Sequence, residues 1–193
     1  MTEPEHTFLF CDLVGFTALS AEQGDDGAAD VAFRFYENVR ALLAEHGAEE
    51  VKTIGDAMMI RCHDPRLAIC LGLRAVDRME ARGLPPVRVG VHTGSAVSRG
   101  GDWYGSGVNV AARLCSAAGG GEVLVSEATG DAAGSLGRVK LGDPQLHWLK
   151  NVTEPVAART AELSSQPRRV WELMTRCPLV PDRHGQATVG GAA

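Results

Sequence analysis

The chain has 193 residues, of which 45% are hydrophobic, and its formal net charge is −5. This length supports one full core rather than two large domains, and the acidic balance argues against a general nucleic-acid binder, which needs a basic face. No apolar run approaches the roughly 18 to 20 residues that cross a bilayer, and the acidic start is unlike a signal peptide, so we expect a cytoplasmic protein whose partners include neither nucleic acid nor membrane.

The first 62 residues predict a strand, a helix and a hairpin. Residues 7–14 form a nearly continuous apolar run, which indicates a buried central strand. After a polar stretch at 23–30, apolar residues recur at helical spacing as far as Leu43. Two strand-like runs within 50–62 flank a Gly-Asp dipeptide at 55–56, which is typical of a tight hairpin turn.

The rest of the chain predicts two more helices and several short strands. Asp64 and Pro65 suit the N-cap and first turn of a helix, and apolar spacing continues this helix to Met79. The other expected elements are strands at 87–92 and 96–99 separated by a Thr-Gly turn at 93–94, a helix at 105–118, and strands at 122–125, 137–141 and 155–161.

This irregular alternation predicts an α/β fold of the α+β kind, with a mostly antiparallel sheet flanked by helices. We expect one domain over residues 1–163. Hydrophobic periodicity fades beyond it, so the segment 164–193 is expected to be a peripheral or partly disordered tail. The five cysteines include no C-x-x-C pair, and their spacing is not that of a zinc site.

Two aspartates are the strongest candidates for a metal site. Asp12 falls inside the apolar strand, where an ionised carboxylate is costly unless a cation or hydrogen-bond donors compensate it. A structural ion pair would explain this residue alone. Asp56 lies at the predicted hairpin tip, which can reach the end of the neighbouring strand, although an ordinary turn aspartate is the simpler interpretation of that residue. Two converging carboxylates suit Mg²⁺ or Mn²⁺, which prefer oxygen ligands and substrate phosphates.

Two further segments carry groups suited to an anion. The glycine turn at 15–17 leads into a helix start, which presents backbone N–H groups. The helix at 105–118 is apolar almost all round, apart from a polar stripe of Asn109, Arg113 and Ser116. An arginine fork matches phosphate oxygens, whereas an internal salt bridge is the alternative explanation for Arg113.

The chain resembles the class III adenylyl/guanylyl cyclase family through FLFCDLVGFT, VKTIGDAMM, VRVGVHTG and DWYGSGVNVAARL, in the expected order. The match covers roughly 7–163, and its joint pattern is highly specific. The resemblance implies a ferredoxin-like class III nucleotidyl cyclase fold with two ions, Mg²⁺ or Mn²⁺, per site. The residues it implies are Asp12, Asp56 and the backbone of Leu13 as metal ligands, Gly15, Phe16 and Thr17 around the triphosphate, Asn109 at the ribose, Arg113 at the α-phosphate, and Lys150 at a distal phosphate.

The family places its two base-reading residues where this chain has Lys52 and Asp102. Lysine only donates hydrogen bonds and ionised aspartate only accepts them. Adenine offers the complementary acceptor at N1 and donor at its exocyclic amine, whereas guanine presents the opposite pattern. We therefore expect ATP to be preferred over GTP. Next to Lys150 the chain departs from the family pattern, because Asn151 stands where the family often has glycine.

The resemblance implies an adenylate cyclase that converts ATP into 3′,5′-cyclic AMP and pyrophosphate. It also implies a homodimer, because the family takes its metal aspartates from one chain and its base-reading and Asn/Arg residues from the other. One alternative is a cyclase-like domain that binds nucleotide or a partner and regulates without turnover. A guanylyl or diguanylate cyclase is another, against which the Lys52/Asp102 pair and the lack of a GGDEF-type stretch both count.

Overall fold

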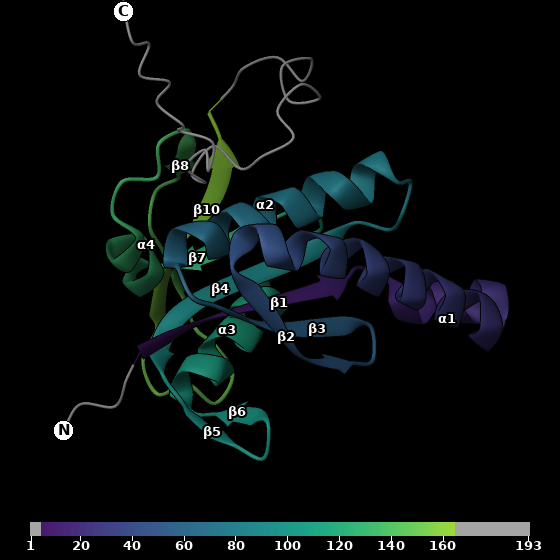
Figure 1. The fold of residues 1–193 in the computed structure, drawn as a ribbon, viewed down its shortest axis with the longest axis horizontal. Coiled ribbons are helices and arrows are strands. Elements are labelled where there is room, and N and C mark those ends of the chain that lie inside the picture. The colour runs from purple at the N-terminus through teal and green to yellow at the C-terminus, as the bar shows by residue number, and fades with distance from the viewer. Residues whose placement is uncertain (1–4, 165–193) are drawn as a thin grey trace, which may run out of the picture.

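A computed structural model describes residues 5–164, and an eight-stranded sheet runs through them (Figure 1). Its strands are β1 (Glu5–Leu13), β2 (Ala48–Ile54), β3 (Ala57–Cys62), β4 (Val87–Ser95), β7 (Val123–Ser126), β8 (Val139–Leu141), β9 (Gln145–His147) and β10 (Val156–Leu163). They lie in the order β2-β3-β1-β4-β7-β10-β8, with β9 beside β10. Only the β4–β7 pairing among them is parallel, which confirms the expected mostly antiparallel sheet.

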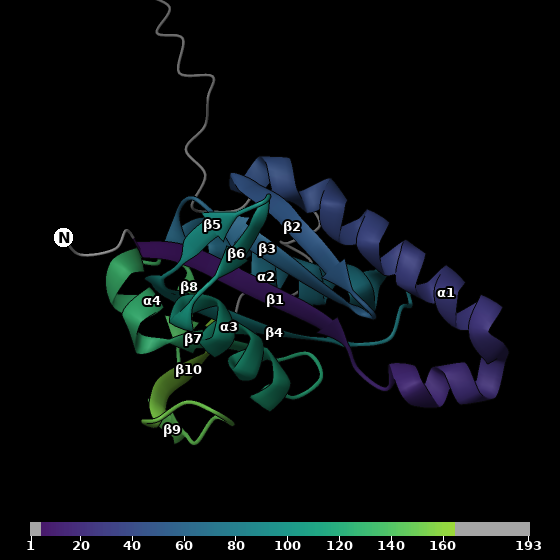
Figure 2. The ribbon, with the colours of Figure 1, turned by 90° about the horizontal axis from the view of Figure 1, so that it is seen from below.

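Helices cover both faces of this sheet. The two long helices α1 (Phe16–Leu43) and α2 (Pro65–Ala81) lie side by side on one face, and α3 (Ser106–Ala117) lies on the other (Figures 1 and 2). A short helix α4 (Glu127–Ala133) follows β7, and a 3₁₀ turn at Ala44–His46 ends α1. The predicted cap of α2 is confirmed, because the Asp64 side chain accepts a hydrogen bond from the Arg66 N–H at 2.8 Å.

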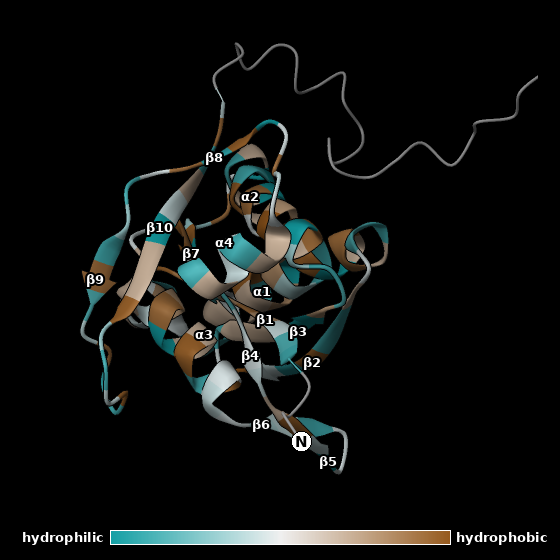
Figure 3. Cartoon of the chain, turned by 90° about the vertical axis from the view of Figure 1, so that its left-hand side faces the viewer, coloured by the Kyte–Doolittle hydropathy of each residue, from teal (hydrophilic) through white to brown (hydrophobic). Residues whose placement is uncertain are grey.

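Alternation along the central strands decides which side chains face which helices. Successive strand residues point to opposite faces of a sheet. The odd-numbered residues of β1 and β4 pack in the larger core under α1 and α2: these are Leu9, Cys11, Leu13, Val87, Val89 and Val91. Phe8 and Phe10 pack on the other face with Ala111 and Cys115 of the largely hydrophobic α3 (Figure 3). The same alternation therefore places Asp12 and Arg88 on the α3 face.

The first helix is longer than its apolar spacing indicated, and one expectation about a turn was wrong. Helix α1 begins at Phe16 and runs through the polar stretch at 23–30, with a local break at Gly24 where φ is 76°. No turn interrupts β4 at 93–94, because β1 pairs with it along its whole length and the Thr7 and Thr93 hydroxyls share a hydrogen bond of 2.9 Å. The glycine at 94 instead leaves room for the His92 side chain and for α3, since a Cβ there would lie 2.7 Å from His92 Nε2 and 3.3 Å from the Cα of Gly107.

Three short elements were not expected from the sequence. They are α4, β9 and β6 (Asp102–Tyr104). Each of these elements is too short to show a clear hydrophobic periodicity in the sequence. β6 pairs with β5 (Val97–Arg99), which confirms the strand expected at 96–99, and this two-stranded hairpin projects beside β2. Most of the expected tail at 164–193 lies outside the described residues; Ser164, which is within them, donates its N–H to the Arg138 carbonyl at 2.8 Å. Within 5–164, no helix is long and apolar enough to cross a bilayer.

Gly90 allows α3 to approach β4 closely. A Cβ at this position would lie 2.1 Å from the backbone nitrogen of Cys115 and 2.5 Å from the carbonyl oxygen of Ala111. Those distances are too short for any side chain, and the atoms concerned are backbone, which cannot rotate away. The absence of a side chain at Gly90 thus sets the depth at which α3 and its polar stripe sit on the sheet.

Replacing Gly90 by alanine is expected to destabilise the fold by about 3 kcal/mol or more, because α3 must lift off the sheet. Denaturant unfolding followed by circular dichroism measures the change. Gly142→Ala is the matched control, since the nearest neighbour of a Cβ there is the Thr160 carbonyl oxygen at 3.6 Å. Equal stability of the two variants would contradict the close-approach interpretation.

Candidate active site

Asp12 and Asp56 lie together at the end of β1. Asp12 is paired across the sheet with Ala57, the residue that follows Asp56. The Leu13 N–H donates to the Asp56 carbonyl at 3.2 Å. Burial raises the pKa of the Asp56 carboxyl, and the nearby negative charge of Asp12 raises it further. Two carboxylates that were 44 positions apart in the chain are thus close enough to repel each other electrostatically.

The tip of the β2–β3 hairpin is held against α1. The Tyr36 hydroxyl donates a hydrogen bond to the carbonyl of Gly55, which has a φ of 60° in the turn. On the same helix, Arg40 makes a two-pronged contact with Glu50 of β2, at 2.6 and 2.8 Å. These contacts fix the turn that carries Asp56, so its carboxylate is oriented by α1 as well as by the sheet.

Arg88 is a charged residue of this site that the sequence analysis missed. Its Nε and Nη2 atoms lie 2.7 and 2.5 Å from the same oxygen, Oδ2, of Asp12. The structural ion pair considered as an alternative for Asp12 is therefore present in the described chain. Arg88 could have been found only from the β1–β4 register, which places it opposite Asp12. The sequence alone does not show that register.

The residues present fit hard cations whose coordination is completed from outside the protein. Asp12 and Asp56 supply carboxylate oxygens, as Mg²⁺ and Mn²⁺ prefer. Since the Leu13 N–H is used by Asp56, any contribution from Leu13 would come from its carbonyl oxygen. Residues 5–164 contain no group of three or more His, Cys, Asp or Glu side chains arranged for a metal. Additional ligands would therefore have to be water or the phosphates of a nucleotide.

The turn at 15–17 follows the aspartate strand directly. Gly15 has a φ of 80° and caps α1, which begins with Phe16 and Thr17. No side chain caps this helix start, and Gly15 and Thr17 are exposed. The first N–H groups of a helix have no partner inside it and carry partial positive charge. They consequently form an open anion-binding end a few residues from Asp12.

Lys52 and Asp102 meet, although 50 positions separate them. The Lys52 ammonium donates to Asp102 Oδ2 at 2.5 Å, and the Trp103 N–H donates to Oδ1 at 2.8 Å. The hydrogen bond from Lys52 lowers the pKa of the Asp102 carboxyl. A lysine donor and a carboxylate acceptor are thus held side by side, and both are partly exposed, at 40% and 23% of their side-chain surface.

Trp103 anchors the hairpin that carries Asp102. Its ring stacks edge-on with His6 and Phe8 of β1, at centroid distances of 4.4 and 5.7 Å. The Arg61 guanidinium lies over the same ring at 4.8 Å. Because few other contacts join β6 to the sheet, this cluster determines where the Asp102 carboxylate is placed.

Asn109 and Arg113 lie on the outward side of α3. Asn109 is exposed and Arg113 is partly exposed. Arg113 forms no ion pair with any residue of 5–164, so the internal salt bridge considered for it is absent from the part of the chain described. Asp12 forms the ion pair that was considered as its alternative explanation, whereas Arg113 does not.

Lys150 is exposed and forms no ion pair with any residue of the described part of the chain. Asn151 has a φ of 62°, the left-handed region that glycine adopts most easily and asparagine tolerates best among other residues. The departure from glycine at 151 therefore preserves the backbone shape of this loop. Its neighbour Leu149 is buried against α3, which keeps the loop near that helix.

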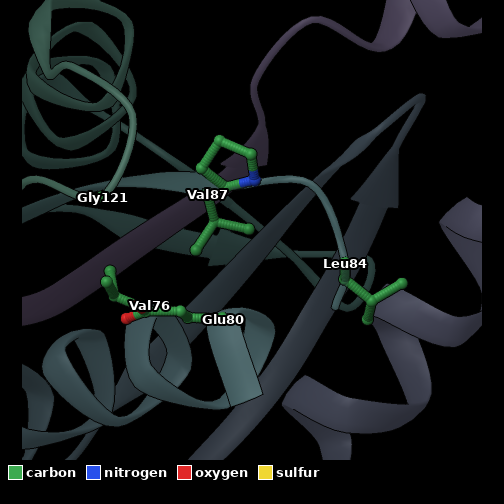
Figure 4. A pocket seen from close by; sticks show the side chains of 6 residues that line it. Val76, Glu80, Leu84, Val87 and Gly121 are labelled. Atoms are coloured by element: carbon green, nitrogen blue, oxygen red, sulfur yellow. The ribbon is translucent and has the colours of Figure 1, made fainter. Parts of the chain in front are cut away.

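The predicted residues form two separate groups within one chain. Lys52 lies within β2, whereas Asp56 lies in the turn that follows this strand, and no hydrogen bond or ion pair among residues 5–164 joins the Lys52–Asp102 pair to Asp12 or Asp56. A cavity of about 280 Å³ lies on the α2 side and is distinct from both groups (Figure 4). It is lined by Val76, Glu80, Leu84, Pro86, Val87 and Gly121.

Comparison with known proteins identifies the family. The family model of the adenylate and guanylate cyclase catalytic domain matches residues 2–140. The chain belongs to this family. A pH-sensitive adenylate cyclase of Mycobacterium tuberculosis is 40% identical over 129 residues, covering 66% of this chain and 32% of that protein. An adenylate cyclase of Streptomyces griseus is 35% identical over 120 residues, covering 62% and 30%. The cyclase domain thus spans about a third of the length of these curated relatives.

The fold agrees with solved cyclase structures. The adenylyl cyclase CyaB from P. aeruginosa superposes with a TM-score of 0.72 and 23% identity, covering 84% of this chain and 95% of that one. At this identity the likeness concerns the fold alone. It confirms the predicted class III cyclase architecture for the cyclase domain, including the sheet that brings Asp12 and Asp56 together.

Trp103→Ala is expected to destabilise the cyclase domain by about 2 to 3 kcal/mol, because three ring contacts that anchor β6 are lost. Trp148→Ala is the matched control. Its side chain is exposed, at 79% relative accessibility, and a change there is expected to stay within about 0.5 kcal/mol. Urea unfolding of both variants measures the difference. A Trp103 variant as stable as the wild type would mean that the hairpin is held by other contacts.

Proposed function

We propose that this domain is an adenylate cyclase that converts ATP into 3′,5′-cyclic AMP and pyrophosphate. The observation that carries the proposal is the convergence of Asp12 and Asp56 beside the open N-terminus of α1. Two carboxylates next to unpaired N–H groups suit a triphosphate that arrives with divalent cations. The two curated relatives described above are named adenylate cyclases, which supports the same reaction.

The choice of ATP is supported by the Lys52–Asp102 pair. Lysine has two further N–H donors after the bond to Asp102, and each carboxylate oxygen can accept more than one hydrogen bond. The pair can therefore donate to adenine N1 and accept from its exocyclic amine without being separated. Guanine would place its own donor against the ammonium and its own acceptor against the carboxylate.

A homodimer is supported by the separation of the two groups of residues. Asn109 and Arg113 project from α3 without partners among residues 5–164. We propose that a second copy supplies Lys52, Asp102, Asn109 and Arg113 to the aspartates of the first. A two-fold arrangement would give two equivalent sites.

In the proposed mechanism, each group of residues has a separate task. Asp12 and Asp56 hold two divalent cations, which when bound supply positive charge to the triphosphate and ease deprotonation of the ribose 3′-hydroxyl. The N–H groups at 15–17 orient the phosphates, with Lys150 near the distal ones. Asn109 positions the ribose, and Arg113 stabilises charge on the α-phosphate.

The bond changes are those of an in-line displacement. The 3′-oxygen forms a bond to the α-phosphorus, the bond from that phosphorus to the bridging oxygen breaks, and pyrophosphate leaves. No described side chain is placed as a dedicated base, so the hydroxyl proton passes to water or to a phosphate oxygen.

Purified protein with Mn²⁺ is expected to form cyclic AMP from ATP, and to form much less cyclic GMP from GTP at the same concentration. Arg113→Ala is expected to lower kcat by about 10²- to 10³-fold, because a preorganised charge at the reacting phosphate is lost. Product formation is measured by chromatography. A dimer that binds ATP but forms no cyclic nucleotide would favour a regulatory binding domain instead.

Mixing Asp12→Ala chains with Arg113→Ala chains is expected to restore activity that neither variant has alone, because half of the sites in a heterodimer contain only wild-type residues. Two Asp12→Ala preparations carrying different affinity tags serve as the control, since mixing them creates no intact site. Absence of recovery in chains proven to have mixed would place the whole site within one chain.

A further inference from the structure

The most unexpected contact of the site is the one between Arg88 and Asp12. Two guanidinium nitrogens, Nε and Nη2, approach the same carboxylate oxygen at 2.7 and 2.5 Å. The Asp12 side chain is only 15% exposed, and that of Arg88 is 33% exposed. The carboxylate charge is therefore compensated within the described chain before any metal arrives.

The position of Arg88 is determined by the sheet. Arg88 is the residue of β4 directly opposite Asp12 of β1. Antiparallel neighbours that lie opposite each other share a face, which here is the face covered by α3.

We propose that Arg88 occupies the cation position at Asp12 in the metal-free chain, and that a metal ion binds Asp12 only when this guanidinium leaves Oδ2. The proposal rests on the metal-ligand role given to Asp12 above. A divalent cation bound to either oxygen of this carboxylate would lie close to the guanidinium, which already contacts Oδ2. Two cations on one carboxylate would repel each other strongly where the side chain is only 15% exposed. Metal binding and release of Arg88 are consequently one coupled exchange.

The structure offers the displaced guanidinium a second acceptor. Arg88 Nη1 already donates to the Ser116 carbonyl at 3.2 Å. Ser116 lies in the last turn of α3, where carbonyl oxygens have no helical partner and carry partial negative charge. Arg88 can therefore keep this bond while Nε and Nη2 leave Asp12. A residue bonded only to the carboxylate would have no such alternative.

This exchange has two opposite effects on the domain. Without metal, Arg88 relieves the repulsion between Asp12 and Asp56 and stabilises the end of β1. With metal, the same residue is a competitor and weakens binding. Removing its charge should therefore destabilise the metal-free protein and strengthen metal binding, two changes that a general folding defect would not combine.

The test measures Mn²⁺ binding without nucleotide, by the electron paramagnetic resonance signal of free Mn²⁺. Arg88→Gln keeps a hydrogen-bond donor but removes the charge, and is expected to bind Mn²⁺ about tenfold more tightly than the wild type. Its melting temperature without metal should fall, and the rise on adding Mn²⁺ should exceed that of the wild type. Arg40→Gln is the matched control, because it removes a charge paired with Glu50 elsewhere and should leave Mn²⁺ affinity unchanged.

An Arg88→Gln variant that binds Mn²⁺ no better than the wild type, or shows no binding at millimolar Mn²⁺, would overturn the proposal. If that variant does not fold, Arg88→Lys replaces it. A single ammonium cannot reproduce the two-nitrogen contact, so about threefold tighter binding is expected, and wild-type affinity would overturn the proposal. Asp12→Asn separates the two levels of inference. Unchanged Mn²⁺ binding in Asp12→Asn would contradict the metal site itself, whereas loss of binding there with unchanged Arg88→Gln would contradict only the exchange.

Discussion

The pairing of β1 with both of its neighbours is the constraint on which the candidate site depends. One register places Asp12 next to the turn that carries Asp56, and the other places it opposite Arg88. A slip of one residue would reverse every side chain of β1, so that Asp12 would enter the apolar core and Leu13 would face α3. The buried Leu9, Cys11 and Leu13 oppose such a slip. The hydrophobic core therefore positions the polar site.

Small residues allow α3 to pack closely against the sheet. Gly90 and Gly107 bring the helix backbone against β4, and this depth brings the end of α3 within reach of Arg88. The remaining polar residues of the helix, Asn109 and Arg113, are left on its outer side. Packing on one side of α3 and unpaired polar groups on the other are thus two results of the same placement.

The sequence predicted the order of most elements because their signals are local. A nearly continuous apolar run marked the central strand, and Asp64 with Pro65 marked the start of α2. The wrong turn at 93–94 shows where such reasoning ends, since a glycine that makes room for neighbouring groups looks the same in the sequence as one that makes a turn. Arg88 was missed for a related reason: its partner is 76 positions away, and only the register reveals it. The predicted hairpin allowed Asp56 to reach the end of the strand that carries Asp12, and the resemblance to the cyclase family added their pairing as metal ligands.

The base-reading role proposed for Lys52 and Asp102, which are bonded directly to each other, also bears on how base preference could change during evolution. A chain in which only one of them is replaced would offer either purine one matching and one mismatching group. Such an intermediate would recognise neither base well. A lineage could therefore move from one nucleotide to the other only by changing both positions nearly together, and this requirement would tend to preserve whichever preference its ancestor had.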